Sequence, residues 1–336
     1  MRFKPAPLKP AAKTPNHTRG ELHPRNLHRA PYDFPRLIGR CPELAHFLQP
    51  HPLGGDTIDF ADPAAVATLN RALLKLHYGV AHWEIPPGSL CPPVPSRADY
   101  LHHAAGLLAE SNDGAPPHGP GIVALDIGTG ANAIYPLIGS AVYGWRFVAT
   151  DADAVSINWA RGLIASNPPL AKTVDCRFQP ATDAIFENIA GPDERFALSV
   201  CNPPFHASPE GAAAGTFRKL RNLGGGHPVK AVLNFGGQSH ELWCPGGEVA
   251  FVRRMIRESA DRPELCAWFT TLVSKQGNLP AIHRDLARAR VADVRTLTMF
   301  AGQKQSRIVA WTFLPSALRI QRLSTNSPLS PSRSAR

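Results

Sequence analysis

Asn202, Pro203, Pro204 and Phe205 form the tetrapeptide of this 336-residue chain that is best suited to chemistry. The side-chain carbonyl of Asn202 can accept a hydrogen bond from an amino group. The prolines fix φ and carry no amide hydrogen, so the carbonyl of Pro203 is a second, rigid acceptor. An aromatic ring at Phe205 can stack on a planar base, a contact worth ~1–3 kcal/mol. The tetrapeptide therefore predicts a site that orients an amine towards an electrophile, where alignment matters more than a classical general base.

A glycine-rich turn precedes this tetrapeptide, at Asp126-Ile127-Gly128-Thr129-Gly130. It follows a short apolar run, and glycines there let the backbone approach a ligand closely. Asp151 ends the next apolar run, where a carboxylate can accept hydrogen bonds from both ribose hydroxyls. These features predict a cofactor that contains adenosine. S-adenosylmethionine fits better than a nicotinamide dinucleotide, because the loop lacks the third glycine that lets a helix approach a pyrophosphate.

The elements that must position these residues are short apolar runs alternating with helical patterns. Helices are predicted at residues 156–165, 247–259 and 279–289, and strands are predicted at residues 121–125, 146–150, 176–178, 196–200, 266–273, 294–300 and 307–313. This alternation predicts an α/β fold with a mostly parallel, doubly wound sheet. Only five residues, 302–306, separate the last two strands, which is too short for a crossover helix. We therefore expect an antiparallel hairpin at the end of the sheet.

Outside this domain we expect a mainly helical N-terminal segment and two tails. Helices are predicted at 63–77, where Asp62 is the expected N-cap, and at 97–110. Gly, Pro and Asn/Asp crowd into residues 111–120 and indicate a break. The expected organisation is a basic disordered tail at 1–22, the helical segment at 23–112, a linker at 113–120, the main domain at 121–315 and a second disordered tail at 316–336.

Composition narrows the partners and the compartment. A formal net charge of +10 and a pI near 9.6 favour a polyanion such as nucleic acid. The six cysteines form no CxxC pair and no Cys/His cluster, so we expect a reduced protein without a metal site. No stretch reaches the roughly 18 apolar residues of a membrane span, and the N-terminus lacks the apolar core of a signal peptide. We expect a cytoplasmic monomer.

Taken together, these stretches resemble the bacterial 23S ribosomal RNA adenine-N6 methyltransferases, which are similar to eukaryotic methyltransferase-like RNA enzymes. The resemblance runs from about residue 23 to residue 313. It is carried by His23-Pro24-Arg25-Asn26, TIDFADP at 57–63, DIGTGAN at 126–132, CNPPF at 201–205 and NFGGQSHELWCPGGE at 234–248, among other stretches. It implies a Rossmann-like class I methyltransferase sheet and S-adenosylmethionine as the methyl donor. It also implies methylation of a specific adenine of 23S ribosomal RNA, free or in a large-subunit assembly intermediate.

The resemblance also carries site residues over by position. It implies that the cofactor site is lined by Arg97, Gly128, Asp151, Thr182 and Asn202. Arg97 can meet the cofactor carboxylate with two parallel hydrogen bonds, although from the residues alone it resembles a surface charge on a helix. Asp151 stands where related enzymes often have Glu, a change that still suits a ribose. Asp126 and Gly130 complete the expected cofactor loop.

RNA contacts are expected from two basic groups. The resemblance assigns RNA binding to the N-terminal segment with Arg25 and Arg29, whose alternative role is to pack on the main domain. The insertion after Phe205 contains Arg218, Lys219 and Arg221, which suit a loop that closes over a flipped base, or a plain connector. The residues from Gly236 to Glu241 and Trp243 look too specific for a spacer, but their role cannot be assigned from sequence.

Two other functions fit parts of the pattern. An Asn-Pro-Pro-aromatic loop can hold a side-chain amide, as in protein-glutamine methyltransferases, although the aromatic residue there is usually Tyr and here is Phe205. A non-catalytic RNA-binding or ribosome-assembly protein could retain the fold. An intact Asn202 loop favours catalysis, because a protein that only binds RNA has no evident need for that amide and ring.

Overall fold

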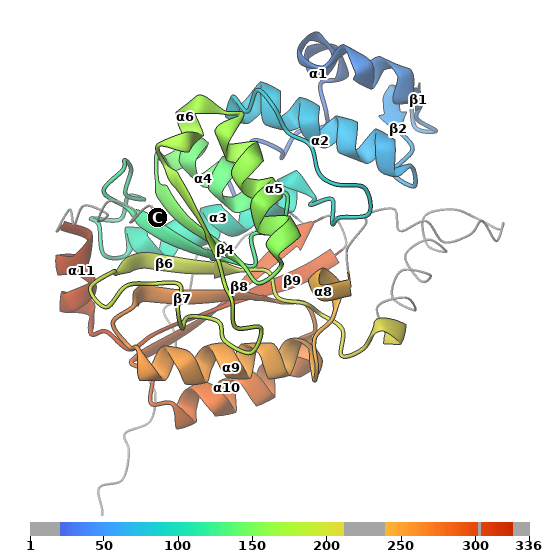
Figure 1. Ribbon diagram of the computed structural model, residues 1–336. Coiled ribbons are helices and arrows are strands. Elements are labelled where there is room, and N and C mark those ends of the chain that lie inside the picture. The colour runs from blue at the N-terminus through green and yellow to red at the C-terminus, as the bar shows by residue number, and fades with distance from the viewer. Residues whose placement is uncertain (1–20, 212–238, 302–303, 325–336) are drawn as a thin grey trace, which may run out of the picture.

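A computed structural model describes residues 21–211, 239–301 and 304–324 of the chain (Figure 1). The expected tails therefore fall outside the described residues at 1–20 and 325–336. Arg218, Lys219 and Arg221 fall outside them as well. Among the described residues, no helix is both long enough and apolar enough to cross a membrane, and no cluster of three His, Cys, Asp or Glu side chains is arranged to hold a metal ion.

A seven-stranded sheet forms the centre of the molecule, in the order β5-β4-β3-β6-β7-β9-β8. The strands are β3 (Val123–Ile127), β4 (Arg146–Asp151), β5 (Val174–Phe178), β6 (Phe196–Cys201), β7 (Cys266–Val273), β8 (Asp293–Ala301) and β9 (Lys304–Thr312). The first five strands in the order are parallel, and β9 runs antiparallel to both β7 and β8. The predicted fold class and closing hairpin are confirmed. The hairpin folds back so that its second strand, β9, pairs with β7.

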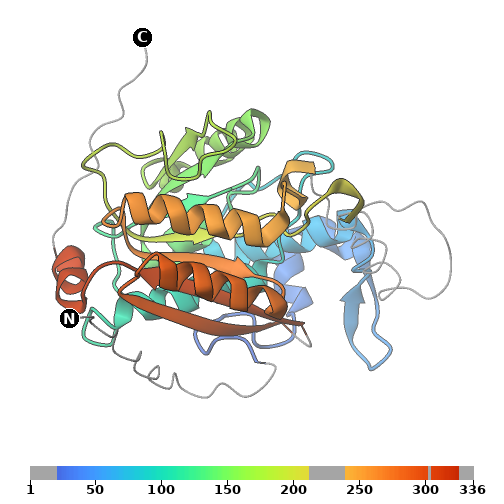
Figure 2. The ribbon, with the colours of Figure 1, turned by 90° about the horizontal axis from the view of Figure 1, so that it is seen from below.

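Helices cover both faces of the sheet, as its alternating side chains require. In β3, Ala124 belongs to one apolar cluster, with residues of α3 (Val94–Ala109), α4 (Ile134–Tyr143) and α5 (Ala154–Ala165). Val123, Leu125 and Ile127 belong to the other, with residues of α9 (Gly247–Asp261) and α10 (Leu279–Arg288). Figure 2 shows α9 and α10 lying across this second face. The carboxyl ends of the parallel strands are thus left open between two helical layers.

The N-terminal segment packs onto the first face rather than standing apart. It contains α1 (Phe34–Arg40), the 3₁₀ helix η1 (Pro42–Phe47), β1 (Leu48–Pro50), β2 (Asp56–Ile58) and α2 (Pro63–Tyr78), followed by α3. The segment is mainly helical, but the antiparallel β1–β2 hairpin was not predicted. Asp62 caps α2 by accepting from the amide of Ala64 at 2.8 Å, as expected. One apolar cluster joins this segment to the sheet, so both form a common core.

The prediction of a disordered tail from residue 316 is wrong for its first part, because residues Ser316–Ser324 form the helix α11. Arg319 holds α11 in place. Its guanidinium lies 4.9 Å from the ring centre of Trp268 and donates to the carbonyl of Leu314 at 2.8 Å. A cation–π contact of this kind is strong when the groups are buried. Shorter elements complete the described chain: α6 (Pro168–Ala171), α8 (Ser239–Leu242) and η2 (Gln276–Asn278).

Histidines fasten the start of the described chain to α2 and α3. His28 and Tyr78 share a hydrogen bond of 2.7 Å, as do His102 and Tyr143. His23 stacks on His102 at 5.5 Å. Burial is the main cause that lowers the pKa of His23 to about 3 and the pKa of His28 and of His102 to about 4. These imidazoles are therefore neutral in the folded protein at pH 7.

This cluster predicts a loss of stability in mild acid. Between pH 6.5 and about 4 the folded state binds fewer protons than the unfolded state, because the buried imidazole of His28 stays neutral. The contribution of this imidazole to the free energy of unfolding is therefore complete above pH 6.5 and is lost as the pH falls towards about 4. Each such imidazole adds a slope of up to about 1.4 kcal/mol per pH unit. We expect His28→Gln, which cannot be protonated, to flatten the decline of unfolding free energy between pH 7 and pH 5, measured with urea. His46→Gln, at an exposed position, should keep the wild-type slope. Equal slopes in all three proteins would contradict this role.

Candidate active site

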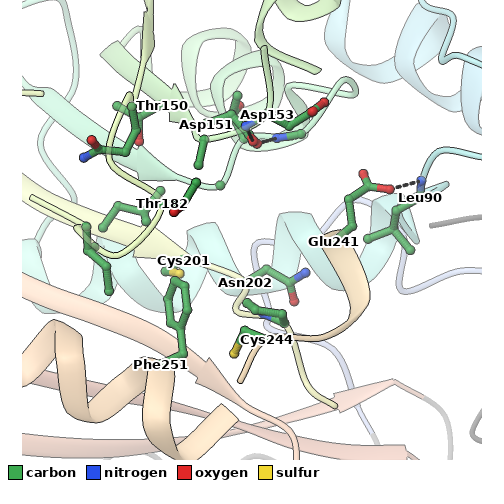
Figure 3. Close-up of a pocket in the computed structure, with 18 of the residues that line it drawn as sticks. Leu90, Thr150, Asp151, Asp153, Thr182, Cys201, Asn202, Glu241, Cys244 and Phe251 are labelled. Atoms are coloured by element: carbon green, nitrogen blue, oxygen red, sulfur yellow. Dashed lines mark hydrogen bonds between the residues drawn. The ribbon is translucent and has the colours of Figure 1, made fainter. Parts of the chain in front are cut away.

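A cavity of about 590 Å³ opens at the carboxyl ends of β3, β4 and β6 (Figure 3). Open α/β sheets bind their ligands at this edge. The cavity brings together seven of the residues predicted for the site: Arg97, Gly128, Gly130, Asp151, Thr182, Asn202 and Pro204. Three others, Asp126, Pro203 and Phe205, do not line it.

The glycine turn forms one wall of the cavity. Gly128 and Gly130 have φ values of 70° and 62°, a left-handed conformation that glycine adopts without strain. The carbonyl of Thr150 accepts from the amides of Gly128 and Thr129, both at 2.9 Å. A side chain at Gly130 would also crowd Asn132, since a Cβ atom there would lie 3.1 Å from Nδ2. The turn is therefore fixed to β4 and bare on the side that faces a ligand.

Asp151 lies at the end of β4, beside this turn. Its Oδ2 accepts from the amide of Gly130 at 2.8 Å, and its Oδ1 accepts from the amide of Asp153 at 2.9 Å. Asp153 in turn caps α5 by accepting from the amide of Ser156 at 2.7 Å. The carboxylate is thus held in one orientation by backbone groups on both sides.

Arg97 extends from α3 into the opposite wall. It is only 8% exposed, and its guanidinium lies 5.9 Å from the ring centre of Tyr135. The described residues give it no ion pair, although a buried charge is costly unless it is paired. An anionic group on a ligand in the cavity would supply the missing partner.

Asp126 lies beneath the glycine turn instead of lining the cavity. It is fully buried, and neither carboxylate oxygen has a hydrogen-bond partner in the described structure. Burial raises its pKa to about 7, and the nearby charge of Asp151 adds to the rise. A contact between Asp126 and a cofactor stays a prediction.

The Asn202 tetrapeptide follows β6 and borders the cavity from below (Figure 3). The hydroxyl of Tyr100 anchors the end of β6 by accepting from the amide of Cys201 at 3.2 Å. The side-chain carbonyl oxygen of Asn202 is buried and has no hydrogen-bond partner among the described residues. Leaving such an acceptor unpaired costs ~1–3 kcal/mol, so it is poised for a donor on a ligand.

Several lining residues come from α8 and the residues after it, which sequence reasoning left without a role. The amide of His206 donates to the carbonyl of Leu242, and the amide of Cys244 donates to the carbonyl of His206, both at 3.0 Å. This pairing brings Glu241, Trp243 and Cys244 to the cavity. The unusual composition of 236–243 was the only signal in the sequence, because the pairing joins segments far apart in the chain.

Glu241 ties α8 to the wall formed by Leu90. Its Oε2 accepts from the amide of Leu90 at 3.0 Å (Figure 3). Glu241→Ala removes this contact and opens the wall, so we expect a three- to tenfold weaker affinity for S-adenosylmethionine, as for the loss of one ~1 kcal/mol hydrogen bond. Glu241→Gln keeps an acceptor and should stay within threefold of wild type. Calorimetric titration of both variants checks the prediction, and equal affinities for Ala and wild type would contradict it.

The two described residues that were expected to bind RNA, Arg25 and Arg29, do not line the cavity. Arg25 is exposed and donates to the carbonyl of His102 at 2.7 Å. Arg29 is exposed and lies 3.1 Å from the carboxylate of Glu21. The guanidinium of Arg25 thus contacts α3, which agrees with its alternative role of packing on the rest of the protein, and Arg29 pairs within the N-terminal segment.

Comparison with known proteins places this geometry in a family. The sequence model of a family described as RNA methyltransferase matches residues 16–315. The ribosomal RNA large subunit methyltransferase F of Photobacterium profundum is 51% identical over 323 residues, which cover 91% of this chain and 96% of that protein.

Solved structures agree with this result. The catalytic domain of human METTL16, crystallised with MAT2A 3′UTR hairpin 1, superposes with a TM-score of 0.74 at 27% identity, covering 88% of this chain and 96% of that one. The N-terminal domain of human METTL16 in complex with SAH shares the fold, with a TM-score of 0.69 at 24% identity over 88% of this chain and all of that one. The chain belongs to the RNA methyltransferase family.

Proposed function

We propose that this protein transfers a methyl group from S-adenosylmethionine to the N6 amine of a specific adenine in large-subunit ribosomal RNA. The observation that carries the proposal is the unpaired, buried carbonyl oxygen of Asn202 beside a cavity built for an adenosine-containing ligand. The substrate class is supported by the name of the 51% identical relative. Action on ribosomal RNA implies a cytoplasmic enzyme, and we expect it to work as a monomer.

The cavity residues fit S-adenosylmethionine, which supplies an electrophilic methyl group when bound. Asp151 would accept hydrogen bonds from the ribose hydroxyls, because its carboxylate is already fixed by two backbone amides. Arg97 would pair with the carboxylate of the methionine part, and its guanidinium would then have an ion-pair partner. Gly128 and Gly130 leave room for the ligand to lie against the backbone. Thr182, on the rim, completes the enclosure.

The Asn202 tetrapeptide would hold the acceptor amine. The N6 group of adenine donates one hydrogen to the side-chain carbonyl of Asn202 and the other to the backbone carbonyl of Pro203. The nitrogen lone pair is delocalised into the ring, so holding both hydrogens turns it towards the methyl carbon and assists the attack. Phe205 would stack on the base after it leaves its helix, a step that costs a few kcal/mol. Pro203 and Phe205 are not among the residues that line the cavity, so their contacts with the base would lie just beyond that lining.

The two carbonyl oxygens would also stabilise the charge that develops on the reacting nitrogen. The reacting nitrogen gains positive charge as its bond to the methyl carbon forms and the bond between that carbon and the sulfonium sulfur breaks, so that a neutral thioether leaves. The two carbonyl oxygens carry partial negative charge beside the nitrogen at that point. One N–H proton is then lost to solvent, so no side chain needs to act as a general base. Neither His206 nor any cavity carboxylate is required to take up that proton.

Transfer of tritiated methyl groups separates this proposal from its main alternative. The purified protein is incubated with labelled S-adenosylmethionine and with either unmodified 23S ribosomal RNA or a peptide-release factor. We expect label in RNA. Label confined to the protein substrate would establish glutamine methylation instead, and label in neither would favour a non-catalytic role. Repeating the assay with large-subunit assembly intermediates identifies the preferred form of the RNA.

A further inference from the structure

A second hollow, of about 880 Å³, lies between α2 and α5 and shares no lining residue with the catalytic cavity. Its volume is in the range of ligand sites of ≈ 300–1,000 Å³. Its walls are Arg71 and Lys75 of α2, residues Ala81 to Glu84 of the following connector, and Trp159 and Gly162 of α5. We call it the α2–α5 groove.

Trp159 is the feature that distinguishes this groove. Its ring is 40% exposed, which is unusual for so large an apolar side chain. Its indole nitrogen donates to the carbonyl of Glu84 at 2.9 Å, so the ring is held in place. An exposed aromatic ring in a fixed orientation is a stacking platform, because little conformational entropy is lost when a planar group binds to it.

The wall formed by the connector at residues 81–84 is equally rigid. Asn167, only 2% exposed, accepts from the amides of Ala81 and His82 at 2.9 and 3.1 Å and donates to the carbonyl of His82 at 2.8 Å. The indole of Trp83 donates to the carbonyl of Asn132 at 3.1 Å. The groove therefore keeps its shape without a ligand.

The groove adjoins the catalytic cavity. Asp153 lines the cavity and caps α5, while Val155, two residues later, lines the groove and is 68% exposed. From Asp153 to Trp159 the helix rises about 9 Å. The connector that forms the groove wall at Trp83 continues to Leu90, which lines the cavity. A chain that enters the cavity from this side must pass over the groove.

Charges in the groove nearly balance. Arg71 and Lys75 face the exposed carboxylates of Glu43 and Glu84, and the pair between Arg71 and Glu84 is loose, at 3.7 Å. Phosphates alone would gain little from such a surface. Stacking on Trp159 must supply the recognition, which favours an unpaired nucleotide over the backbone of a duplex.

We infer that the α2–α5 groove binds an unpaired nucleotide that flanks the target adenine, with its base stacked on Trp159. This inference rests on the proposed RNA substrate and extends it with a second contact point. Holding a neighbouring nucleotide would fix the register of the RNA and favour the extrusion of one particular adenine into the cavity.

Removal of the ring is the first test. Trp159→Ala should weaken the binding of 23S ribosomal RNA at least fivefold, the lower limit for the loss of one base–aromatic stack. Trp159→Phe keeps a ring and should recover most of the affinity. Leu318→Ala is the control, because it removes an apolar side chain that is comparably exposed, at 46%. Leu318 belongs to α11, which lies at the other end of the sheet from α8 (Figure 1), so this variant should keep wild-type RNA affinity. RNA affinity is measured by filter binding and S-adenosylmethionine affinity by calorimetry, with the full chain.

Filling the groove is an independent test. A Cβ atom added to Gly162 would meet nothing within 4 Å, so Gly162→Leu projects into the groove without internal strain and improves helix propensity. It should fold normally and still weaken RNA binding at least fivefold. Wild-type RNA affinity in both Trp159→Ala and Gly162→Leu would overturn the inference and leave the groove to another kind of partner. An equal loss of RNA and cofactor affinity would also overturn it, because the effect would then come through the cavity wall.

The two proposals can fail separately. If wild-type protein binds ribosomal RNA with a contribution from Trp159 but methylates no adenine, the proposed function fails and the groove assignment survives. If the wild-type protein methylates adenine but Trp159→Ala and Gly162→Leu keep wild-type RNA affinity, only the groove assignment fails.

Discussion

Asn202→Ala is expected to lower the rate constant of methyl transfer by about 10²–10³-fold, the usual effect of removing one preorganised polar group that acts on the transition state. The side-chain carbonyl oxygen of Asn202 is buried beside the cofactor cavity and accepts no hydrogen bond from a described residue. Without it, the amine keeps only one acceptor and its lone pair is no longer directed at the methyl carbon. Single-turnover assays with labelled cofactor measure the effect.

Two controls separate alignment from binding in this variant. S-adenosylmethionine affinity and RNA affinity should both stay within a few-fold of wild type, because Arg97, Asp151 and the glycine turn are intact. A methylation rate close to that of wild type would remove Asn202 from the mechanism. A large loss of cofactor affinity would instead assign it a binding role.

Arg97→Met should weaken S-adenosylmethionine binding by about 10–150-fold, as expected for hydrogen bonds to a charged group worth ≈ 1.5–3 kcal/mol. The guanidinium is buried in the cavity wall and forms no salt bridge with a described residue, so a cofactor carboxylate is its natural partner. Calorimetric titration gives the dissociation constants directly.

A matched ligand makes this prediction specific. 5′-Methylthioadenosine has the same nucleoside but no amino acid part, so its affinity should be nearly equal for wild type and Arg97→Met. Arg257→Met, at an exposed position on α9 outside the cavity lining, should bind both ligands as wild type does. An equal loss of affinity for both ligands would show that Arg97 supports the fold of the cavity and does not contact a carboxylate.

Local patterns in the sequence were sufficient for much of the architecture. The strands of the sheet are short apolar runs bounded by turn residues, and the brief connection at 302–306 allowed only a hairpin. Asp62 caps α2 because its side chain and the following proline favour a helix start. By contrast, seven of the ten residues of α4 are buried, and a short apolar run of this kind does not by itself separate a helix from a strand. The helix α11 depends on Arg319 reaching Trp268, a contact between distant segments.

The site was only partly accessible from sequence for the same reason. The glycine turn, Asp151 and Asn202 follow strands directly, so strand order alone brings them to one edge. Arg97 looks like a surface charge by pattern, and only the resemblance pointed to the cavity, where the fold buries it. Asp126 was expected at the cofactor site, but it is buried and does not line the cavity. Glu241 and Trp243 reach the cavity through the pairing of His206 with residues 242 and 244, which no local pattern indicates.

The most direct test of the account identifies the modified nucleoside. Unmodified 23S ribosomal RNA is incubated with the purified protein and S-adenosylmethionine carrying a deuterated methyl group, then digested to nucleosides for mass spectrometry. We predict deuterated N6-methyladenosine as the single labelled product, formed about 10²–10³-fold more slowly with Asn202→Ala. A label on any other nucleoside, or on a ring nitrogen of adenine, would contradict the claim that Asn202 aligns an exocyclic amine for methylation.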